Sequence, residues 1–129
     1  MTPAEFVTRA VGLPWVRWRS DWRAADCFGL LILYWREVHG QDLGAVPHTD
    51  IATGFAAAAG WQRCEPEPGA CAFMAYHRGA PAHCGVLITA DTVLHSLGDE
   101  KRGGSVRTTG LALMRRVYTD ITFHRPATC

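Results

Sequence analysis

The spacing of apolar positions changes near residue 60, from helical before it to strand-like after it. Residues Thr2 to Ala10 predict a short helix, because Thr2 can cap it, Pro3 suits the first turn and Glu5 completes a capping box. Asp26 to about Val38 predicts a second helix that is apolar over most of its circumference, which is typical of a helix buried in the middle of a domain. The alanine-rich stretch 50–59 predicts a small third helix.

Short segments rich in β-branched and aromatic residues follow, separated by Gly, Pro and Asp turns. They are ACAFMAY, HCGVLIT, TVLHSL, SVRTT and RVYTDITFH, which begin at residues 70, 83, 92, 105 and 116. Helices first and strands second predict an α+β domain in which an antiparallel sheet packs on a helical half. A chain of 129 residues suits one domain, spanning residues 1–129. The tryptophan-rich segment PWVRWRSDWRA, between the first two helices, predicts a loop.

Composition narrows the class of protein. The chain is 48% hydrophobic and 19% charged, with a formal net charge of +1, as in an ordinary globular domain. Its arginines are scattered, so neither nucleic acid nor an anionic membrane is an expected partner. The apolar run 28–35 is far too short to span a bilayer, and the N-terminus shows no signal peptide, so we expect synthesis in the cytoplasm.

The five cysteines do not predict a disulfide framework, because their number is odd and no secretion signal is visible. A zinc site can be drawn from Cys64, Cys71, His77 and Cys84, but the spacing matches no ligand knuckle. Cys71 and Cys84 are better interpreted as small buried residues of strands. We therefore expect no metal and no cofactor.

Cys27 lies where the loop enters the second helix. Free backbone N–H groups and the positive end of the helix dipole favour a thiolate there, and the same N–H groups can stabilise an oxyanion. A lone cysteine at a helix start is nonetheless more often structural than catalytic.

Two histidines supply the base that a thiol nucleophile requires. His83 begins one predicted strand, His95 lies in the next, and the turn TAD joins them. The hairpin makes them cross-strand neighbours, so His95 can hydrogen-bond the far nitrogen of His83 and fix its tautomer. The alternative is a pair of half-buried structural histidines. A further histidine, His48, either reaches the cleft or belongs to a loop.

The segment DCFGLL, followed by HCGVLI and then LHS, resembles the NlpC/P60 cysteine peptidases. Members of that family carry a DCxGLV motif at the start of a helix, an HVGIY-like strand and a third polar residue on the next strand. The segments GLPW and GWQRCEPEPGACAFM also resemble the family, so the likeness extends from about Phe6 to Phe123.

This resemblance implies a papain-like NlpC/P60 fold and a thiol peptidase reaction. Cys27 would be the nucleophile, His83 the base, and His95 the residue that orients His83. Trp15 and Asp26 would border the oxyanion and substrate cleft. The expected substrate is the peptide stem of bacterial peptidoglycan.

Three residues depart from the family pattern. Phe28 replaces the usual Ser after the cysteine, a position where phage tail-associated members often carry a bulky residue. Trp15 replaces a Tyr whose hydroxyl is thought to serve the oxyanion site, and Ala70 replaces the Asp after Gly69.

The branch and the missing signal predict a component of the tail tip of a phage or phage-like particle, in contact with other tail proteins. One alternative is a catalytically weak assembly or plug protein with the same fold, to which exposed Trp18 and Trp22 would contribute interface anchors. Another is a cellular amidase or acyltransferase that acts on a small molecule.

Overall fold

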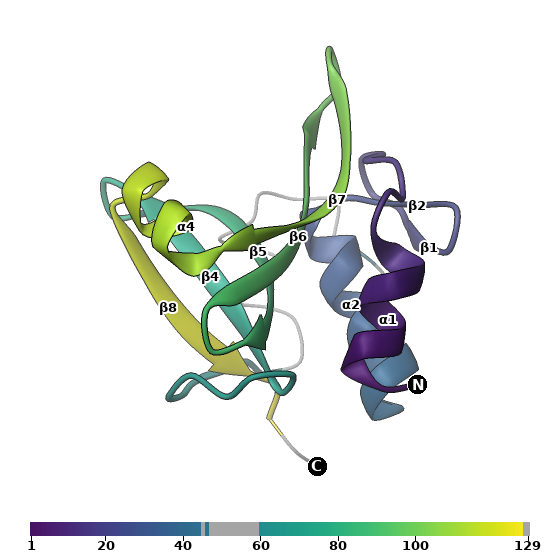
Figure 1. Cartoon of the computed structure of the whole chain (residues 1–129), viewed down its shortest axis with the longest axis horizontal. Helices are drawn as coiled ribbons and strands as arrows, with labels where there is room; N and C mark the ends of the chain where they lie inside the picture. Colours follow the sequence, from purple (N-terminus) through teal and green to yellow (C-terminus); the bar gives the residue numbers. More distant parts are fainter. Residues whose placement is uncertain (45, 47–59, 128–129) are drawn as a thin grey trace.

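The computed structural model describes residues 1–44, 46 and 60–127. Helices α1 (Pro3–Ala10) and α2 (Cys27–His39) lie on one side of a six-stranded sheet, and the short helix α4 (Leu111–Val117) lies on the other (Figure 1). Helices precede strands along the chain and every strand pair is antiparallel, so the predicted α+β architecture is confirmed.

The strands of the large sheet stand in the order β3-β8-β4-β5-β6-β7. Their bounds are β3 Gln62–Arg63, β4 Cys71–His77, β5 Ala80–Thr89, β6 Thr92–Asp99, β7 Gly103–Gly110 and β8 Asp120–Arg125. A separate two-stranded ribbon pairs β1 (Ser20–Asp21) with β2 (Ala24–Ala25). The tryptophan-rich segment is thus a loop that contains a small hairpin.

Both described N-terminal helices begin and end at the expected signals. The Thr2 hydroxyl accepts from the Glu5 N–H and the Glu5 carboxylate accepts from the Thr2 N–H, which is a complete capping box. Asp26 caps α2, and Gly40 ends it with φ +65°, a left-handed conformation that favours glycine. All residues of α2 from Phe28 to Trp35 are buried, which confirms the predicted burial of this helix.

Alternating side chains of the strands divide the core between the two faces of the sheet. On the α2 side, Met74, Val86 and Leu94 pack with Phe6 and Tyr34 of the helices. On the α4 side lies a second cluster made of Phe73, Leu87, Val93, Met114 and Phe123. The sheet is therefore sandwiched, and its central strands are buried on both faces.

The last predicted strand is wrong in its first half. Residues 111–117 form helix α4, and only Asp120–Arg125 forms a strand. Leu111 and Met114 have helical spacing, so one face of the short helix packs on the sheet. His48 and the helix predicted over 50–59 lie outside the described residues.

Strands β5 and β6 pair over only part of their length and then separate. Their pairing ends at Val86–Leu94, after which β6 continues only with β7 as far as Asp99–Gly103, and β5 continues only with β4. In Figure 1 the β6–β7 hairpin extends away from the rest of the sheet. Helix α2 begins at this split, since the Ser96 hydroxyl of β6 donates to the Ala25 carbonyl over 2.6 Å.

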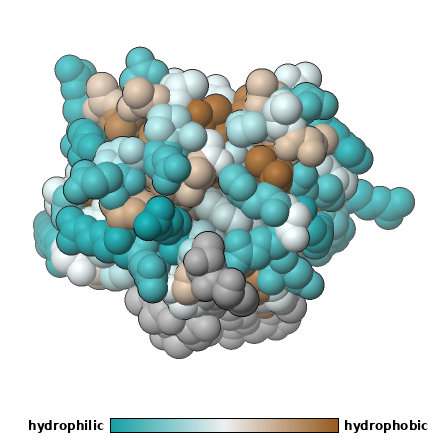
Figure 2. All heavy atoms as spheres, turned by 90° about the horizontal axis from the view of Figure 1, so that it is seen from below, coloured by the Kyte–Doolittle hydropathy of each residue, from teal (hydrophilic) through white to brown (hydrophobic). Residues whose placement is uncertain are grey.

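None of the helices in the described part of the chain is long and apolar enough to cross a membrane. On the face shown in Figure 2, hydrophobic side chains form small groups separated by hydrophilic ones.

Candidate active site

The chain that leads to α2 runs beside β7 before it reaches Cys27. The Gly12 N–H donates to the Val106 carbonyl over 2.9 Å, and the Val106 N–H donates to Leu13 over 2.8 Å. The Ala25 N–H then donates to the Pro14 carbonyl over 3.1 Å. The loop is thereby tied to the sheet on one side and to the start of α2 on the other.

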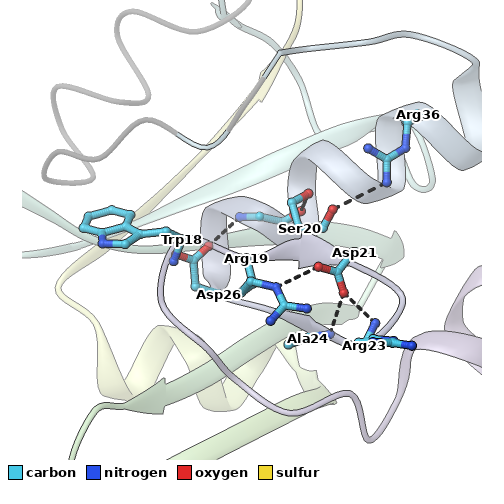
Figure 3. A network of polar contacts seen from close by, with 9 residues as sticks. Trp18, Arg19, Ser20, Asp21, Arg23, Ala24, Asp26 and Arg36 are labelled. Atoms are coloured by element: carbon cyan, nitrogen blue, oxygen red, sulfur yellow. Dashed lines mark hydrogen bonds and ion pairs between the residues drawn. The ribbon is translucent and has the colours of Figure 1, made fainter.

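Two aspartates hold the loop together (Figure 3). The Asp26 carboxylate accepts from the Gly29 N–H and from the Trp18 N–H, each over 2.7 Å. Asp21 accepts from the Arg19 guanidinium over 2.7 Å and from two backbone N–H groups, and the Arg19 contact in particular lowers the pKa of Asp21 to about 2. Burial raises the pKa of Asp26. Asp26 thus acts in the structure as a helix cap and a loop clamp.

Gly29 allows the loop and helix to approach closely. A Cβ at this position would collide with the Arg19 carbonyl, and the Ser20 hydroxyl donates to the Gly29 carbonyl over 2.6 Å. Close packing of the loop against α2 therefore requires a glycine at this position of the DCFGLL segment. Any side chain there would push the loop away from the residue that carries the thiol.

Cys27 is a partly exposed residue whose thiol is buried in contact with both His83 and Cys84 of β5. Hydrogen bonding from the Cys84 thiol first, and then from His83 and the Cys84 backbone N–H, holds the pKa of Cys27 well below its usual value despite burial. The pKa of Cys84 is raised well above its usual value, chiefly because its thiol is hydrogen-bonded to Cys27. Cys27 is therefore the sulfur that ionises, and Cys84 remains a thiol donor.

His83 and His95 form the contact expected of them. The Nε2 atom of His83 lies 2.8 Å from Nδ1 of His95, and Nε2 of His95 lies 2.7 Å from the Thr109 hydroxyl. Since Nε2 of His83 faces His95, its Nδ1 is the nitrogen left for Cys27. Burial, followed by the charges of His83 and Arg107, lowers the pKa of His95 to about 3, so His95 is neutral at neutral pH.

Aromatic rings fix the plane of His83. Tyr118, just after α4, stacks on His83 with ring centroids 6.0 Å apart and an interplanar angle of 13°. Phe73 contacts His83 edge-to-face, with ring centroids 6.0 Å apart. His77 stacks on Tyr118, with ring centroids 4.7 Å apart. Burial and the negative charge of Cys27 raise the pKa of Tyr118, so its phenol stays protonated beside the thiolate.

The absence of a side chain at Gly85 lets β5 approach β6 closely beside His95. A Cβ there would lie 2.5 Å from the Leu94 carbonyl oxygen and 2.9 Å from the His95 Cβ. The glycine of the HCGVLI segment is thus required by the close approach of β5 and β6.

Trp15 lies at the β6–β7 hairpin, against Gly98. It lines a cavity of about 330 Å³ with Trp18, Arg17 and Glu100, and the last two form a 2.8 Å ion pair. The predicted part of Trp15 in an oxyanion site stays a prediction.

Ala70, which departs from the family pattern, and Trp22, a predicted interface anchor, lie away from Cys27. Ala70 follows Gly69, whose carbonyl accepts from the Tyr34 hydroxyl over 2.6 Å, and Tyr34 lies about 10 Å along α2 from Cys27. Trp22 is half-buried, with its indole N–H donating to Glu37 over 3.1 Å and Arg9 stacked 4.0 Å above its ring. Its predicted exposure is therefore wrong, whereas Trp18 is exposed.

The four residues considered as a zinc site do not lie together in the structure. Cys64 contacts Cys71 on the α4 side of the sheet, whereas Cys84 contacts Cys27. Within the described ranges, no three His, Cys, Asp or Glu side chains are grouped so that they could hold a metal ion.

Comparison with solved structures gives a match over nearly the whole chain. The NlpC/p60 domain of the peptidoglycan hydrolase SagA superimposes with a TM-score of 0.63, covering 98% of this chain and 100% of that one, at 17% sequence identity. The chain has the NlpC/p60 fold. No family model matches the sequence, and no curated protein matches it. The predicted fold class is confirmed.

Within the NlpC/p60 fold, the structure adds three residues to the predicted site. The sequence predicts a small buried residue at Cys84, and it is buried, but its thiol also contacts the Cys27 thiol. Tyr118 was assigned to a strand and instead follows a helix that brings it over His83. Thr109 carries no chemical signal in the sequence, and only the register of β7 places it beside His95.

Proposed function

We propose that this protein is a cysteine peptidase that hydrolyses peptide stems of bacterial peptidoglycan. The observation that carries the proposal is the contact of Cys27, at the N-terminus of α2, with His83, which is itself held by His95. Support for the substrate comes from the resemblance of the motifs and from the fold shared with a domain of a peptidoglycan hydrolase.

The first half of the reaction uses the ion pair of Cys27 and His83. The thiolate attacks the peptide carbonyl, and the oxygen takes up the electron pair of the C=O bond. The Cys27 N–H, the first of the helix, is suited to stabilise this oxyanion. The tetrahedral intermediate then collapses, the C–N bond breaks, and Nδ1 of His83 gives its proton to the leaving amine.

The second half reverses the roles of the same groups. Neutral His83 removes a proton from water, which attacks the thioester carbon, and the C–S bond breaks to release the carboxylate product and the Cys27 thiolate. Asp26 and Gly29 keep the nucleophile in place by capping the helix and admitting the loop.

The decisive experiment compares the purified protein with its Cys27→Ala variant on isolated peptidoglycan. We expect the wild-type protein to release new amino termini, and we expect the variant to release at least about 1,000-fold fewer per unit time. Mass spectrometry of the soluble fragments identifies the cleaved bond. Equal release by both proteins would refute the peptidase assignment and favour an assembly protein with the same fold.

We also propose that the protein acts at the tail tip of a phage or phage-like particle. Support comes from Phe28, because tail-associated members of the family that the sequence resembles often carry a bulky residue after the cysteine. Peptides of this chain should be found by mass spectrometry in purified tailed particles from the host. Their presence only in the cytosolic fraction would contradict the location and leave the peptidase assignment intact.

A further inference from the structure

A chain of three hydrogen-bonding groups runs outward from the candidate nucleophile. It begins at His83, passes through His95 over 2.8 Å and ends at the Thr109 hydroxyl over 2.7 Å. His95 stands opposite Arg107 in the β6–β7 register, and Thr109 is two residues along on the same face of β7. Both distances fall in the range of well-formed hydrogen bonds.

The protons of this chain can be assigned when His83 is an imidazolium. Both ring nitrogens of His83 then donate, so Nδ1 of the neutral His95 must accept. A neutral imidazole carries one proton, and the remaining proton of His95 therefore sits on Nε2 and must be donated. The Thr109 oxygen is the group that receives it.

We propose that Thr109 is a positioning residue that holds His95 in the tautomer able to accept a hydrogen bond from the His83 imidazolium. A hydroxyl can accept this proton, whereas the guanidinium of the neighbouring Arg107 only donates and would enforce the opposite tautomer. The inference rests on the proposed function only in treating His83 as the base. It adds a fourth member to the predicted set of Cys27, His83 and His95.

Other charged or titratable groups surround the chain and enter any pH profile. His83 faces Cys27 and Tyr118, Cys27 also faces Cys84, and Tyr118 stacks in turn on His77. His95 faces Arg107. A variant at Thr109 changes none of these groups, so a difference between its profile and that of the wild-type protein isolates the hydroxyl.

The test compares Thr109→Val, which removes only the hydroxyl function, with Thr109→Ser, which keeps it. In Thr109→Val we expect kcat/KM on peptidoglycan fragments to fall about 3- to 10-fold, with most of the change in kcat. In the pH profile, the alkaline limb, where the His83 imidazolium loses its proton, should move down by about half a pH unit, while the acid limb, where Cys27 ionises beside the imidazolium, stays in place. Thr109→Ser should restore both.

Thr108→Val is the matched control. Thr108 is exposed and stands opposite Leu94, so its side chain lies on the other face of the same strand. This variant should keep the wild-type rate and profile. A profile for Thr109→Val that coincides with that of the wild-type protein would overturn the proposal.

Alkylation of Cys27 by iodoacetamide, followed against pH in the same variants, separates this inference from the substrate assignment. The alkaline step of alkylation, where His83 loses its proton beside the thiolate, should move down in Thr109→Val whether or not peptidoglycan is cleaved. If no variant cleaves peptidoglycan while the alkylation profile still shifts, the proposed function fails and the role of Thr109 stands.

Nitrogen NMR of the unaltered protein gives a further check that needs no variant. We expect the His95 proton on Nε2 at the pH where His83 is an imidazolium. A proton on Nδ1 would overturn the proposal.

Discussion

Two pairs of cysteines lie on opposite faces of the same sheet and differ sharply in their chemistry. In each pair a fully buried cysteine of a central strand, Cys84 on β5 or Cys71 on β4, contacts a more exposed one, Cys27 or Cys64. The pKa of Cys27 is lowered, whereas burial raises the pKa of Cys64 and lifts that of Cys71 to about 11.

The difference shows that a neighbouring thiol does not by itself activate a cysteine. Cys27 lies at the start of a 13-residue helix and beside His83, whereas Cys64 precedes a turn with the acidic side chains of Glu65 and Glu67 nearby. A thiol hydrogen bond stabilises whichever sulfur is already favoured as the anion. The helix start and the imidazole decide which pair contains such a sulfur.

The largest expected effect is on the free energy of unfolding and comes from the pair of His83 and His95. This pair lies beside Cys27 and has no counterpart beside Cys64. His95 has a folded-state pKa of about 3, below that of the unfolded chain, so the unfolded chain binds the proton first as the pH falls. Stability is therefore lost as the pH drops from about 6.5 towards 3. Between pH 7 and 4.5 we expect this one group to lower the free energy of unfolding by about 2–3 kcal/mol.

Urea unfolding of the wild-type protein and of His95→Gln at both pH values measures this contribution. Gln cannot become charged, so the loss of stability on acidification should be smaller in the variant by that amount. Identical losses in the two proteins would show that His95 is not held neutral by the fold.

The next effect tests the thiol donor. Replacing Cys84 by Ala removes the hydrogen bond that contributes most to the low pKa of Cys27, so that pKa should rise by about one to two pH units. Thiolate absorbance or the pH dependence of Cys27 alkylation gives the value. Cys84→Ser, which keeps a donor, should show a smaller rise.

Cys71→Ala is the matched control, because it opens a cavity of the same kind on the opposite face of the sheet. It should destabilise the protein to a similar extent and leave the pKa of Cys27 unchanged. A shift of equal size in both variants would mean that looser packing, and not the lost donor, alters Cys27.

A third expectation compares the two partly exposed cysteines directly. At pH 6.5, iodoacetamide should modify Cys27 about 10-fold faster than Cys64, since a larger thiolate fraction outweighs the lower nucleophilicity of a more acidic thiol. Peptide mapping after brief exposure reports both rates in one sample. Faster modification of Cys64 would reverse the assignment of the reactive pair.

The smallest effect is expected from Cys64→Ser. This side chain is half-exposed and outside the candidate site, so the free energy of unfolding should change by no more than about 0.5 kcal/mol. Peptidoglycan hydrolysis should stay at the wild-type rate. A large loss of activity here would tie the second pair to the reaction.

The local parts of the site were predictable, and the long-range parts were not. The contact of His83 with His95 was predicted from the hairpin, although the β5–β6 pairing stops at Val86–Leu94 and the two rings meet beyond it. The cap at Asp26 follows from adjacent residues. Tyr118 and Thr109 reach the site through the docking of α4 and the register of β7, which depend on packing between distant segments. Helix α4 was misassigned because β-branched and aromatic residues follow directly on its short apolar pattern.

The separation of β5 and β6 affects how well the sheet is protected against pairing with other chains. Where two strands of a sheet separate, each gains an unpaired edge, and exposed edges invite pairing with other chains. Here the start of α2 occupies the split, with Ala25 bonded to Ser96 on one side and Cys27 receiving the Cys84 N–H on the other. The segment that carries Cys27 therefore also shields an internal edge of the sheet against pairing with other chains.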